Sequence, residues 1–366
     1  MFNNDERIVL TLDAGGTNFV FTAIQGNKEI VAPITLPSNS HDLDKCLDTL
    51  LEGFTNIRQK VNGDPVAVSF AFPGPADYEN GIIGDLPNFP SFRGGVALGP
   101  FLQEKLQLPV FINNDGNLFA YGEALAGALP GINKELEAAG STKQYKNLLA
   151  VTLGTGFGGG VVINNVLLTG DNGTGGDVWC SAYKYDFNFI AEEGASIRAI
   201  KSKYNEFAGE QHTGLEPKDI FDIAEGVKEG NKDAAIKSFE ELGRIAGFTI
   251  AESLNIVDGI VVVGGGIAKA YKYILPAMAA EMNAQRGTFK GDRFSRLQMK
   301  VYNLMDENNK AEFLKDESKD VMVPGTERTI KYNTGKKTGV TVSALGTSEA
   351  VSLGAYAFAL TQLDDK

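Results

Sequence analysis

A carboxylate followed at once by a glycine-rich turn stands near the start of the chain. Asp13 lies at the end of an apolar stretch that begins at Ile8. The residues of the turn are Gly15, Gly16, Thr17 and Asn18. Glycines let backbone N–H groups point towards an anion such as phosphate. Phosphate would repel the Asp13 carboxylate unless a divalent cation lay between them, which indicates a magnesium-bound nucleotide with the ion held through water.

Apolar residues resume after this turn, from Phe19 to Ile24, so the turn joins two strands. In the P-loop and in the dinucleotide-binding fingerprint, by contrast, the glycine turn opens a helix. A tight hairpin with an acidic residue before it gives the same pattern without any ligand. This stretch alone therefore leaves a phosphate loop and a plain hairpin open.

Two later glycine turns also follow apolar strands. The stretch Thr11–Phe21 aligns with Thr152–Val162, and each reads as a strand, a glycine turn and a second strand. The second turn contains Gly154, Thr155 and Gly156, and the third contains Gly264, Gly265 and Gly266. A repeated strand–turn–strand unit predicts a duplicated architecture with a ligand cleft between the two halves.

A second carboxylate, Asp115, stands where a strand passes into a helix. The strand covers Leu108–Asn113, and the helix that follows should end at Pro130-Gly131. Phosphoryl transfer needs a metal ion, anion-binding turns and one carboxylate near the attacking hydroxyl, so Asp115 is a candidate general base. Aspartate also caps helix N-termini well, and the two roles are compatible.

Helices and strands alternate along the rest of the chain. Apolar residues at helical spacing predict an amphipathic helix over Asp42–Lys60, and Pro65–Phe72 reads as a buried strand. The pattern is largely helical from Ala191 to Val257, and a last helix covers Thr347–Leu363. Residues 303–338 are polar and mixed in charge, and we expect an excursion there, partly a hairpin or lobe.

The bulk composition excludes several classes of protein. The 366 residues are 43% hydrophobic and 22% charged, with a formal net charge of -12 that disfavours nucleic acid and anionic membranes as partners. Cys46 and Cys180 are too few for a disulfide framework or a multi-cysteine zinc site. No signal peptide and no apolar run long enough to span a membrane is present, so we expect a cytoplasmic location.

Six short motifs occur in one order along the chain. They are Leu12–Thr17, Phe72–Pro75, Pro87–Pro90, Asn113–Asp115, Leu153–Gly156 and Val263–Gly266. Together they resemble a sugar kinase of the ROK family, within the actin-like, hexokinase-like ATPases. The resemblance implies an α/β, two-domain actin-like (ribonuclease H-like) fold with a helix-flanked mixed sheet in each domain. It places residues 1–113 plus 346–366 in a small domain and residues 114–345 in a large one.

The resemblance also implies a role for each motif. Asp13 would orient Mg-ATP through water, and Asp115 would be the catalytic base. The ATP-binding residues would be Asp13, Gly15, Gly16, Thr17, Asn18, Gly154, Thr155, Gly156, Gly264, Gly265 and Gly266, the last three along the adenosine. The sugar-binding residues would be Gly74, Asn88, Asn114, Asp115, Asp177 and Glu192.

The sugar side departs from the family pattern. Where the family has a Gly-Glu-x-Gly-His stretch, Asp177 stands for the glutamate and Cys180 for the histidine. The cysteine-rich zinc loop is missing, so we expect no zinc site. An aromatic segment replaces it, and we expect its side chains to lie in the core or a wall rather than to stack on sugar. They are Tyr183, Tyr185, Phe187 and Phe189.

The resemblance predicts an ATP-dependent hexose kinase that phosphorylates the 6-hydroxyl of glucose, in carbohydrate metabolism and glycolysis, as a homodimer. The acid-rich sugar set suits a neutral hexose. Fructose, mannose and N-acetylhexosamines remain open as substrates. The family's regulators carry an N-terminal helix-turn-helix domain, for which the strand at Ile8 leaves no room. Besides a kinase and a regulator, the third hypothesis is a sugar-binding protein of this family that has lost turnover.

Overall fold

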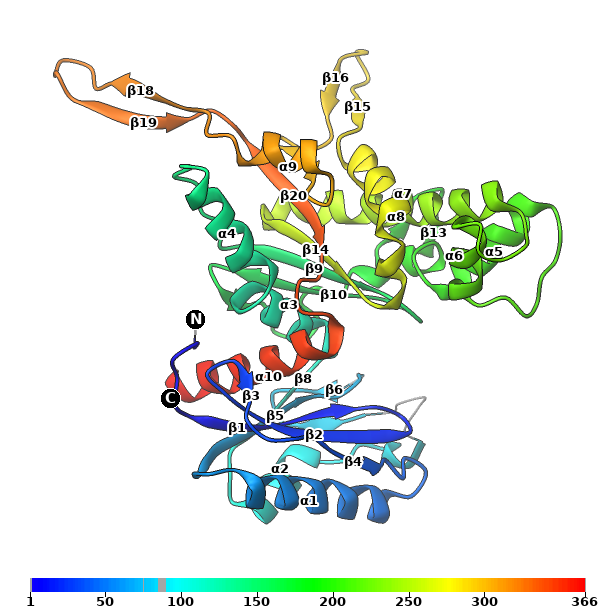
Figure 1. The fold of residues 1–366 in the computed structure, drawn as a ribbon, viewed down its shortest axis with the longest axis vertical. Coiled ribbons are helices and arrows are strands. Elements are labelled where there is room, and N and C mark those ends of the chain that lie inside the picture. Colours follow the sequence, from blue (N-terminus) through cyan, green and yellow to red (C-terminus); the bar gives the residue numbers. More distant parts are fainter. Residues whose placement is uncertain (1, 75, 85–89, 366) are drawn as a thin grey trace. The chain divides into compact units, whose positions relative to one another are not determined.

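The computed structural model describes residues 2–74, 76–84 and 90–365, and the chain divides into two compact units (Figure 1). Unit 1 comprises residues 1–127, 160–176 and 344–366. Unit 2 comprises residues 128–159 and 177–343. Unit 1 includes the helix that begins at Asp115, whereas our predicted small domain ends at residue 113 before resuming at 346. The predicted boundaries at 113 and 346 stay a prediction.

Unit 1 is built on a six-stranded mixed sheet with the order β3-β2-β1-β5-β8, in which β4 also pairs with β2. The strands are β1 (Ile8–Ala14), β2 (Asn18–Gln25), β3 (Lys28–Glu29), β4 (Ile34–Pro37), β5 (Pro65–Ala71) and β8 (Val110–Asn113). β1 runs antiparallel to β2 and parallel to β5, and β5 runs parallel to β8. The first glycine turn therefore joins two strands, as predicted. A short hairpin of β6 (Ala76–Asp77) and β7 (Ile82–Ile83) follows β5.

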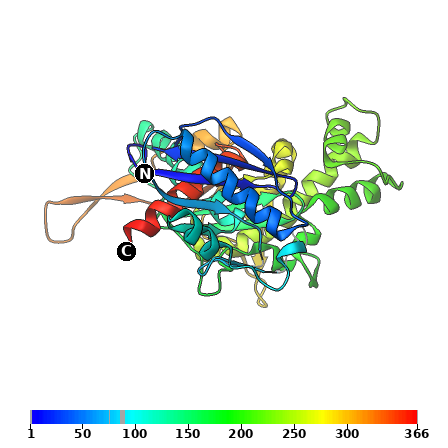
Figure 2. The ribbon, with the colours of Figure 1, turned by 90° about the horizontal axis from the view of Figure 1, so that it is seen from below.

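Helices cover both faces of this sheet because its strands are apolar on both sides (Figure 1). Leu10 and Leu12 pack into a core with α1 (Leu43–Lys60), while Val9 packs with α10 (Thr347–Asp364). Figure 2 shows α1 lying along its face of the sheet. Cys46 is buried on the inner side of α1, and burial raises the pKa of its thiol to about 12. The remaining helices of unit 1 are α2 (Leu98–Leu106) and α3 (Asp115–Leu125).

The second sheet has the order β11-β10-β9-β14-β20-β17 and repeats the plan of the first. Its strands are β9 (Leu148–Leu153), β10 (Phe157–Ile163), β11 (Val166–Leu167), β14 (Ile260–Gly264), β17 (Lys300–Asn303) and β20 (Lys337–Val342). β14 runs parallel to β9 and β20, and β10 runs antiparallel to β11. Asn164 and Asn165 make the hairpin turn with φ of 52° and 64°. The predicted α/β actin-like fold class is confirmed.

Unit 2 carries the other α-helices of the described chain. They are α4 (Ala128–Ala138), α5 (Ile197–Ala208), α6 (Pro217–Ala224), α7 (Lys232–Val257), α8 (Tyr271–Met282) and α9 (Glu307–Leu314). The helix after Asp115 ends at Leu125 rather than at Pro130, and Pro130 lies in the first turn of α4. A proline is tolerated there because the first N–H groups of a helix have no acceptor within it.

Residues 303–338 contain more regular structure than the sequence predicts. The expected hairpin forms between β18 (Ser318–Met322) and β19 (Thr329–Asn333) and projects from unit 2 (Figure 1). The next strand, β20, is a buried inner strand that the polar composition conceals. Its first residue, Lys337, is only 6% exposed because its ammonium donates to the Glu312 and Lys315 carbonyls at 3.2 and 2.8 Å. In the described chain, no helix combines the length and apolarity needed to cross a membrane.

Candidate functional site

The first glycine turn is fixed by hydrogen bonds to its own backbone and to Ser38, and part of it is exposed to solvent. Gly15 donates its N–H to the Asn18 carbonyl at 3.1 Å, and the Ser38 hydroxyl donates to the Gly16 carbonyl at 2.6 Å. A Cβ on Gly15 would lie 2.8 Å from the Asn18 carbonyl oxygen, whereas a Cβ on Gly16 would meet no atom within 4 Å. Gly16 and Thr17 are exposed. The turn is therefore rigid and presents free backbone to a ligand, and Ser38 is a support that sequence reasoning missed.

Asp13 has an available carboxylate at the end of β1. Its side chain is exposed, and it forms no hydrogen bond or ion pair with any residue in the described part of the chain. Mg²⁺ keeps several waters and takes one or two carboxylates plus substrate phosphates, so a single free carboxylate beside a phosphate turn fits this ion. Among the described residues, no group of three or more His, Cys, Asp or Glu side chains could hold a metal by itself.

Asp115 is the first residue of α3, and the N-cap is its neighbour. The Asn114 side chain accepts the Gly116 N–H at 2.8 Å, so Asn114 caps the helix. The Asp115 carboxylate accepts the same N–H at 2.9 Å. The buried Asn113 fixes this junction, because its side-chain oxygen accepts the Asn114 N–H at 2.8 Å and an amide N–H of Asn117 at 3.0 Å. The helix does not depend on Asp115 for its cap.

The pKa of Asp115 is raised, although its side chain reaches the surface. Burial by the surrounding protein is the main cause, and the negative charge of Asp13 adds to it. Hydrogen bonds from the Gly116 and Asp115 amides oppose the shift. Unit 1 therefore brings together the two carboxylates that the sequence singles out, and a carboxylate with a raised pKa is a better proton acceptor than an ordinary aspartate.

Two predicted sugar residues complete the account of unit 1. Gly74 follows β5, and a Cβ there would lie 3.1 Å from the Tyr78 hydroxyl, which itself donates to the Phe72 carbonyl at 2.9 Å. The close approach of Tyr78 explains the glycine. Asn88 lies outside the described residues.

The second glycine turn, in unit 2, lies against the start of α5. Gly154 donates its N–H to the Gly156 carbonyl at 3.0 Å, and its own carbonyl accepts the Ile197 N–H at 2.9 Å. Thr155, at the tip of this turn, is exposed. Backbone groups and the N-terminal end of a helix both favour an anion, which fits the predicted phosphate clamp.

Glu192 reaches this turn directly. One carboxylate oxygen accepts the Phe157 N–H at 3.0 Å, and the other accepts a guanidinium N–H of Arg198 at 2.9 Å. A Cβ on Gly156 would lie 2.6 Å from the first of these oxygens, so Gly156 makes room for Glu192. The sequence predicts a sugar ligand and a phosphate turn here as separate features, and the structure joins them.

Asp177 precedes a short helical turn, Val178–Cys180, and its side chain is exposed. Burial nevertheless raises the pKa of its carboxyl, and a hydrogen bond from Trp179 opposes this. The exposed Cys180 thiol donates to the Asp177 carbonyl at 3.3 Å. The residue in the family's histidine position thus contacts the backbone of the residue in its glutamate position.

Three of the four aromatic side chains do not lie in the core; that they form a wall of the sugar site stays a prediction. Tyr185, Phe187 and Phe189 are 56%, 75% and 56% exposed. They lie at alternate positions around β13 (Asp186–Ile190), which pairs only with β12 (Ala182–Tyr183), so nothing in this two-stranded ribbon covers their face. Tyr183 is half-buried beside Gly194.

The third glycine turn borders a separate pocket of unit 2. Gly264 ends β14, and Gly265 has a φ of 87°, where a Cβ would also collide with the Leu153 carbonyl. The pocket measures about 300 Å³. It is lined by Pro217, Lys218, Phe221, Asp222, Phe239, Gly266, Ile267, Lys269 and Ala270. Its apolar and aromatic lining fits a flat base, in line with the predicted adenosine site. Sequence reasoning missed Phe221 and Phe239, whose helical spacing reads as ordinary core.

Comparisons with known proteins agree with this geometry. The ROK family profile matches residues 9–291. The crystal structure of a glucokinase from Parabacteroides distasonis superposes with a TM-score of 0.90 at 56% identity, covering 99% of this chain and 99% of that one. A glucokinase from Halalkalibacterium halodurans is 27% identical over 76% of this chain and 86% of its own length. An N-acetyl-D-glucosamine kinase from Vibrio cholerae is 27% identical over 70% of this chain and 83% of its own length.

Proposed function

This chain belongs to the ROK family, and we propose that it is an ATP-dependent sugar kinase that transfers the γ-phosphoryl group of ATP to the 6-hydroxyl of glucose. The 56% identity to a glucokinase over 99% of the chain carries the choice of glucose. The observation on this chain that carries the chemistry is the pair Asp13 and Asp115, which lie within electrostatic reach of each other beside the first glycine turn.

In this reaction Asp115 is the general base. Its carboxylate takes the proton of the sugar 6-hydroxyl as the hydroxyl oxygen attacks the γ-phosphorus, and ADP leaves. The raised pKa of Asp115 strengthens it as a base, and the cap from Asn114 holds it at the first residue of α3. Asn114 and Gly74 would bind the sugar from the same unit.

The nucleotide binds to backbone more than to side chains. Gly15, Gly16, Thr17 and Asn18 would cradle phosphate in unit 1, and Gly154, Thr155 and Gly156 would do so in unit 2. Gly264, Gly265 and Gly266 would carry the adenosine towards the apolar pocket at Phe221 and Phe239. Bound magnesium neutralises phosphate charge, and Asp13 would hold its water shell.

The acceptor side favours an uncharged sugar. The candidate ligands Asp177 and Glu192 are carboxylates, and Arg198, the cation on Glu192, is also paired with Glu193 at 2.7 Å. An anionic sugar would meet like charge at these positions. We expect a cytoplasmic homodimer, with Asn88 as a further sugar ligand.

A second candidate is phosphorylation of an N-acetylhexosamine, which the relative from Vibrio cholerae favours. A coupled assay of ADP release with Mg-ATP separates the candidates across glucose, fructose, mannose, N-acetylglucosamine and N-acetylmannosamine. We expect the highest kcat/KM on glucose. A higher kcat/KM on N-acetylglucosamine supports the second candidate, and no turnover on any of the five sugars contradicts both.

A further inference from the structure

The β12–β13 hairpin of unit 2 connects the two acceptor carboxylates along the chain. Asp177 lies before β12, and Glu192 lies directly after β13. The base of the hairpin is closed, because Ala182 pairs with Ile190 and the Ala191 N–H donates to the Ser181 carbonyl at 2.7 Å. The hairpin is therefore joined through its base to the segments on which both carboxylates stand.

A half-buried ion pair holds the tip of this hairpin, together with a hydrogen bond between the Tyr185 hydroxyl and Glu241 of α7. Lys184, between β12 and β13, donates to the Glu281 carboxylate of α8 at 2.7 Å. The side chains are only 19% and 13% exposed. Exposed ion pairs contribute little to stability, whereas breaking a buried pair is strongly destabilising because it leaves an uncompensated charge. The half-buried Lys184–Glu281 pair lies between these two classes, so its loss should cost more than the loss of an exposed pair.

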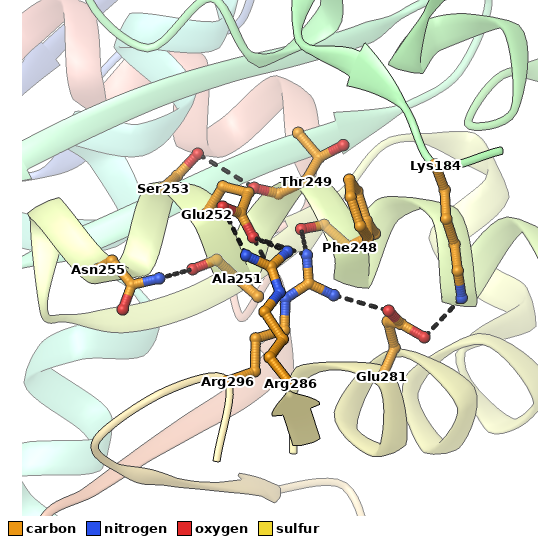
Figure 3. Close-up of polar contacts among 10 residues, drawn as sticks. All are labelled: Lys184, Phe248, Thr249, Ala251, Glu252, Ser253, Asn255, Glu281, Arg286 and Arg296. Atoms are coloured by element: carbon orange, nitrogen blue, oxygen red, sulfur yellow. Dashed lines mark hydrogen bonds and ion pairs between the residues drawn. The ribbon is translucent and has the colours of Figure 1, made fainter. Parts of the chain in front are cut away.

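Glu281 is itself fixed by a second cation, Arg296 (Figure 3). The Arg296 side chain is 2% exposed and donates to the other Glu281 oxygen at 2.6 Å. It also donates to Glu252 at 2.8 Å and to the Phe248 carbonyl at 2.7 Å, and its guanidinium lies 4.2 Å from the centre of the Phe248 ring. Arg296 thus holds the Glu281 carboxylate in place between α7 and α8. The two helices therefore form an anchor for the hairpin tip.

The outer side of the hairpin has no comparable support. Phe187 and Phe189 are exposed, and the strand pairs only with β12. A two-stranded hairpin is only marginally stable by itself. Its position thus depends on contacts at the tip, where Lys184 meets Glu281 and Tyr185 meets Glu241, and on Tyr183, which packs towards Ile245 of α7 around Gly194.

We propose that Lys184 is a positioning residue for the acceptor sugar: its ion pair with the Arg296-anchored Glu281 fixes the β12–β13 hairpin and, through it, Asp177 and Glu192. This inference rests on the proposed sugar-kinase function. In this proposal Lys184 acts through the hairpin and not by binding the sugar itself. Its loss should weaken sugar binding while the chemical step, which depends on Asp115, continues.

The test compares Lys184→Met with Lys184→Arg and with Lys310→Met. Lys310 is a control for the loss of a lysine ion pair elsewhere in unit 2, since it forms a more exposed pair of the same 2.7 Å length with Glu135 between α9 and α4. We expect Lys184→Met to raise the KM for glucose by about tenfold with kcat within about twofold, since a half-buried pair lies between the values for exposed and for fully buried pairs, and about 1.4 kcal/mol is one decade in an equilibrium constant. Lys184→Arg should restore most of the affinity, and Lys310→Met should leave both constants unchanged.

Hydrogen exchange of the backbone amides gives a readout that does not depend on activity. In Lys184→Met the amides of residues 182–193 should exchange about tenfold faster, while those of β9 and β14 should not change. Unchanged exchange in the hairpin, or faster exchange with an unchanged KM, overturns the proposal. If Lys184→Met does not fold, Lys184→Gln removes the charge but keeps a polar side chain, and the same two measurements apply to it.

The proposal and the proposed function fail in different ways. If the wild-type protein phosphorylates no sugar, the proposed function is wrong. The positioning role of Lys184 is then tested by the glucose affinity measured by calorimetry, in place of KM, together with hydrogen exchange. If the wild type is active but Lys184→Met behaves like Lys310→Met, the function stands and the positioning role of Lys184 is wrong.

Discussion

The Glu192 carboxylate accepts a hydrogen bond from the Phe157 amide at 3.0 Å, and this amide is the one directly after the second glycine turn. A predicted sugar ligand thus touches the predicted phosphate clamp within unit 2. The space for this contact comes from Gly156, which has no side chain to displace the carboxylate. In the proposed site, the position of the acceptor sugar and the conformation of the phosphate turn would therefore be coupled through Glu192.

Gly156→Ala should break this coupling. The new methyl group would lie 2.6 Å from the Glu192 carboxylate oxygen, so the carboxylate or the turn must move. We expect kcat/KM for glucose to fall by about tenfold or more, because such overpacking costs about 1–3 kcal/mol. Steady-state kinetics in glucose and in ATP measure the change.

Gly131→Ala is the control for that substitution. Gly131 is exposed within α4, and a Cβ there meets no atom within 4 Å. This variant should keep full activity and gain about 0.5–1 kcal/mol of stability, since alanine is the better helix residue. Equal kinetics for the two variants would show that Glu192 does not need the space at Gly156.

Asp115→Asn should remove the general base and keep the fold. Asn114 remains as the cap of α3, so secondary structure by circular dichroism should match the wild type. We expect kcat to fall by about two to four orders of magnitude, the usual contribution of general acid–base catalysis. A kcat within about threefold of the wild type would rule Asp115 out as the base.

The pH dependence of activity and of stability follows from the raised pKa of Asp115. A base must be ionised, so kcat/KM should fall as the pH drops through the pKa of Asp115, above the ordinary value of 3.8. The folded state also binds this proton more tightly than the unfolded state, so the ionised carboxylate lowers stability at neutral pH.

Asp115→Asn should therefore be more stable than the wild type at pH 7. The difference in free energy of unfolding should shrink as the pH falls below the folded pKa, where the wild-type carboxyl is neutral too. Urea unfolding at several pH values measures it. A variant that is less stable than the wild type at pH 7 would contradict a raised pKa.

Chelation should distinguish a need for magnesium from a structural zinc site. Treatment with EDTA should abolish turnover, and Mg²⁺ alone should restore it, because the exposed Asp13 carboxylate suits a hydrated magnesium ion. The thermal midpoint should not change on chelation, and elemental analysis should find no stoichiometric zinc. Loss of stability with EDTA that zinc reverses would show a structural zinc site after all.

The sequence predicts the strands, glycine turns and helix start of this site well, because each is encoded by residues that are neighbours in the chain. Strands that end in glycine turns at Gly15, Gly154 and Gly264 are visible in a one-dimensional pattern, and so is a carboxylate at the start of a helix. The repeat of these units also predicts the duplicated architecture. Local pattern suffices wherever backbone geometry, rather than a distant partner, determines the structure.

Contacts between distant parts of the chain could not be predicted in this way. The polar residues at the start of β20 gave no strand signal, because the Lys337 ammonium is buried against the carbonyls of Glu312 in α9 and of Lys315 just after it. The aromatic residues Phe187 and Phe189 read as core because composition does not reveal that β13 lacks a covering layer. The Glu192–Phe157 contact spans 35 residues and has no signature in either segment.

The most direct test of the central claim is the identity of the product. Purified protein incubated with glucose and Mg-ATP should yield ADP and a phosphate ester on the 6-hydroxyl, seen by phosphorus and carbon NMR, and Asp115→Asn should yield almost none in the same time. The absence of any sugar phosphate from the wild type, or ADP release without an ester, would contradict the account.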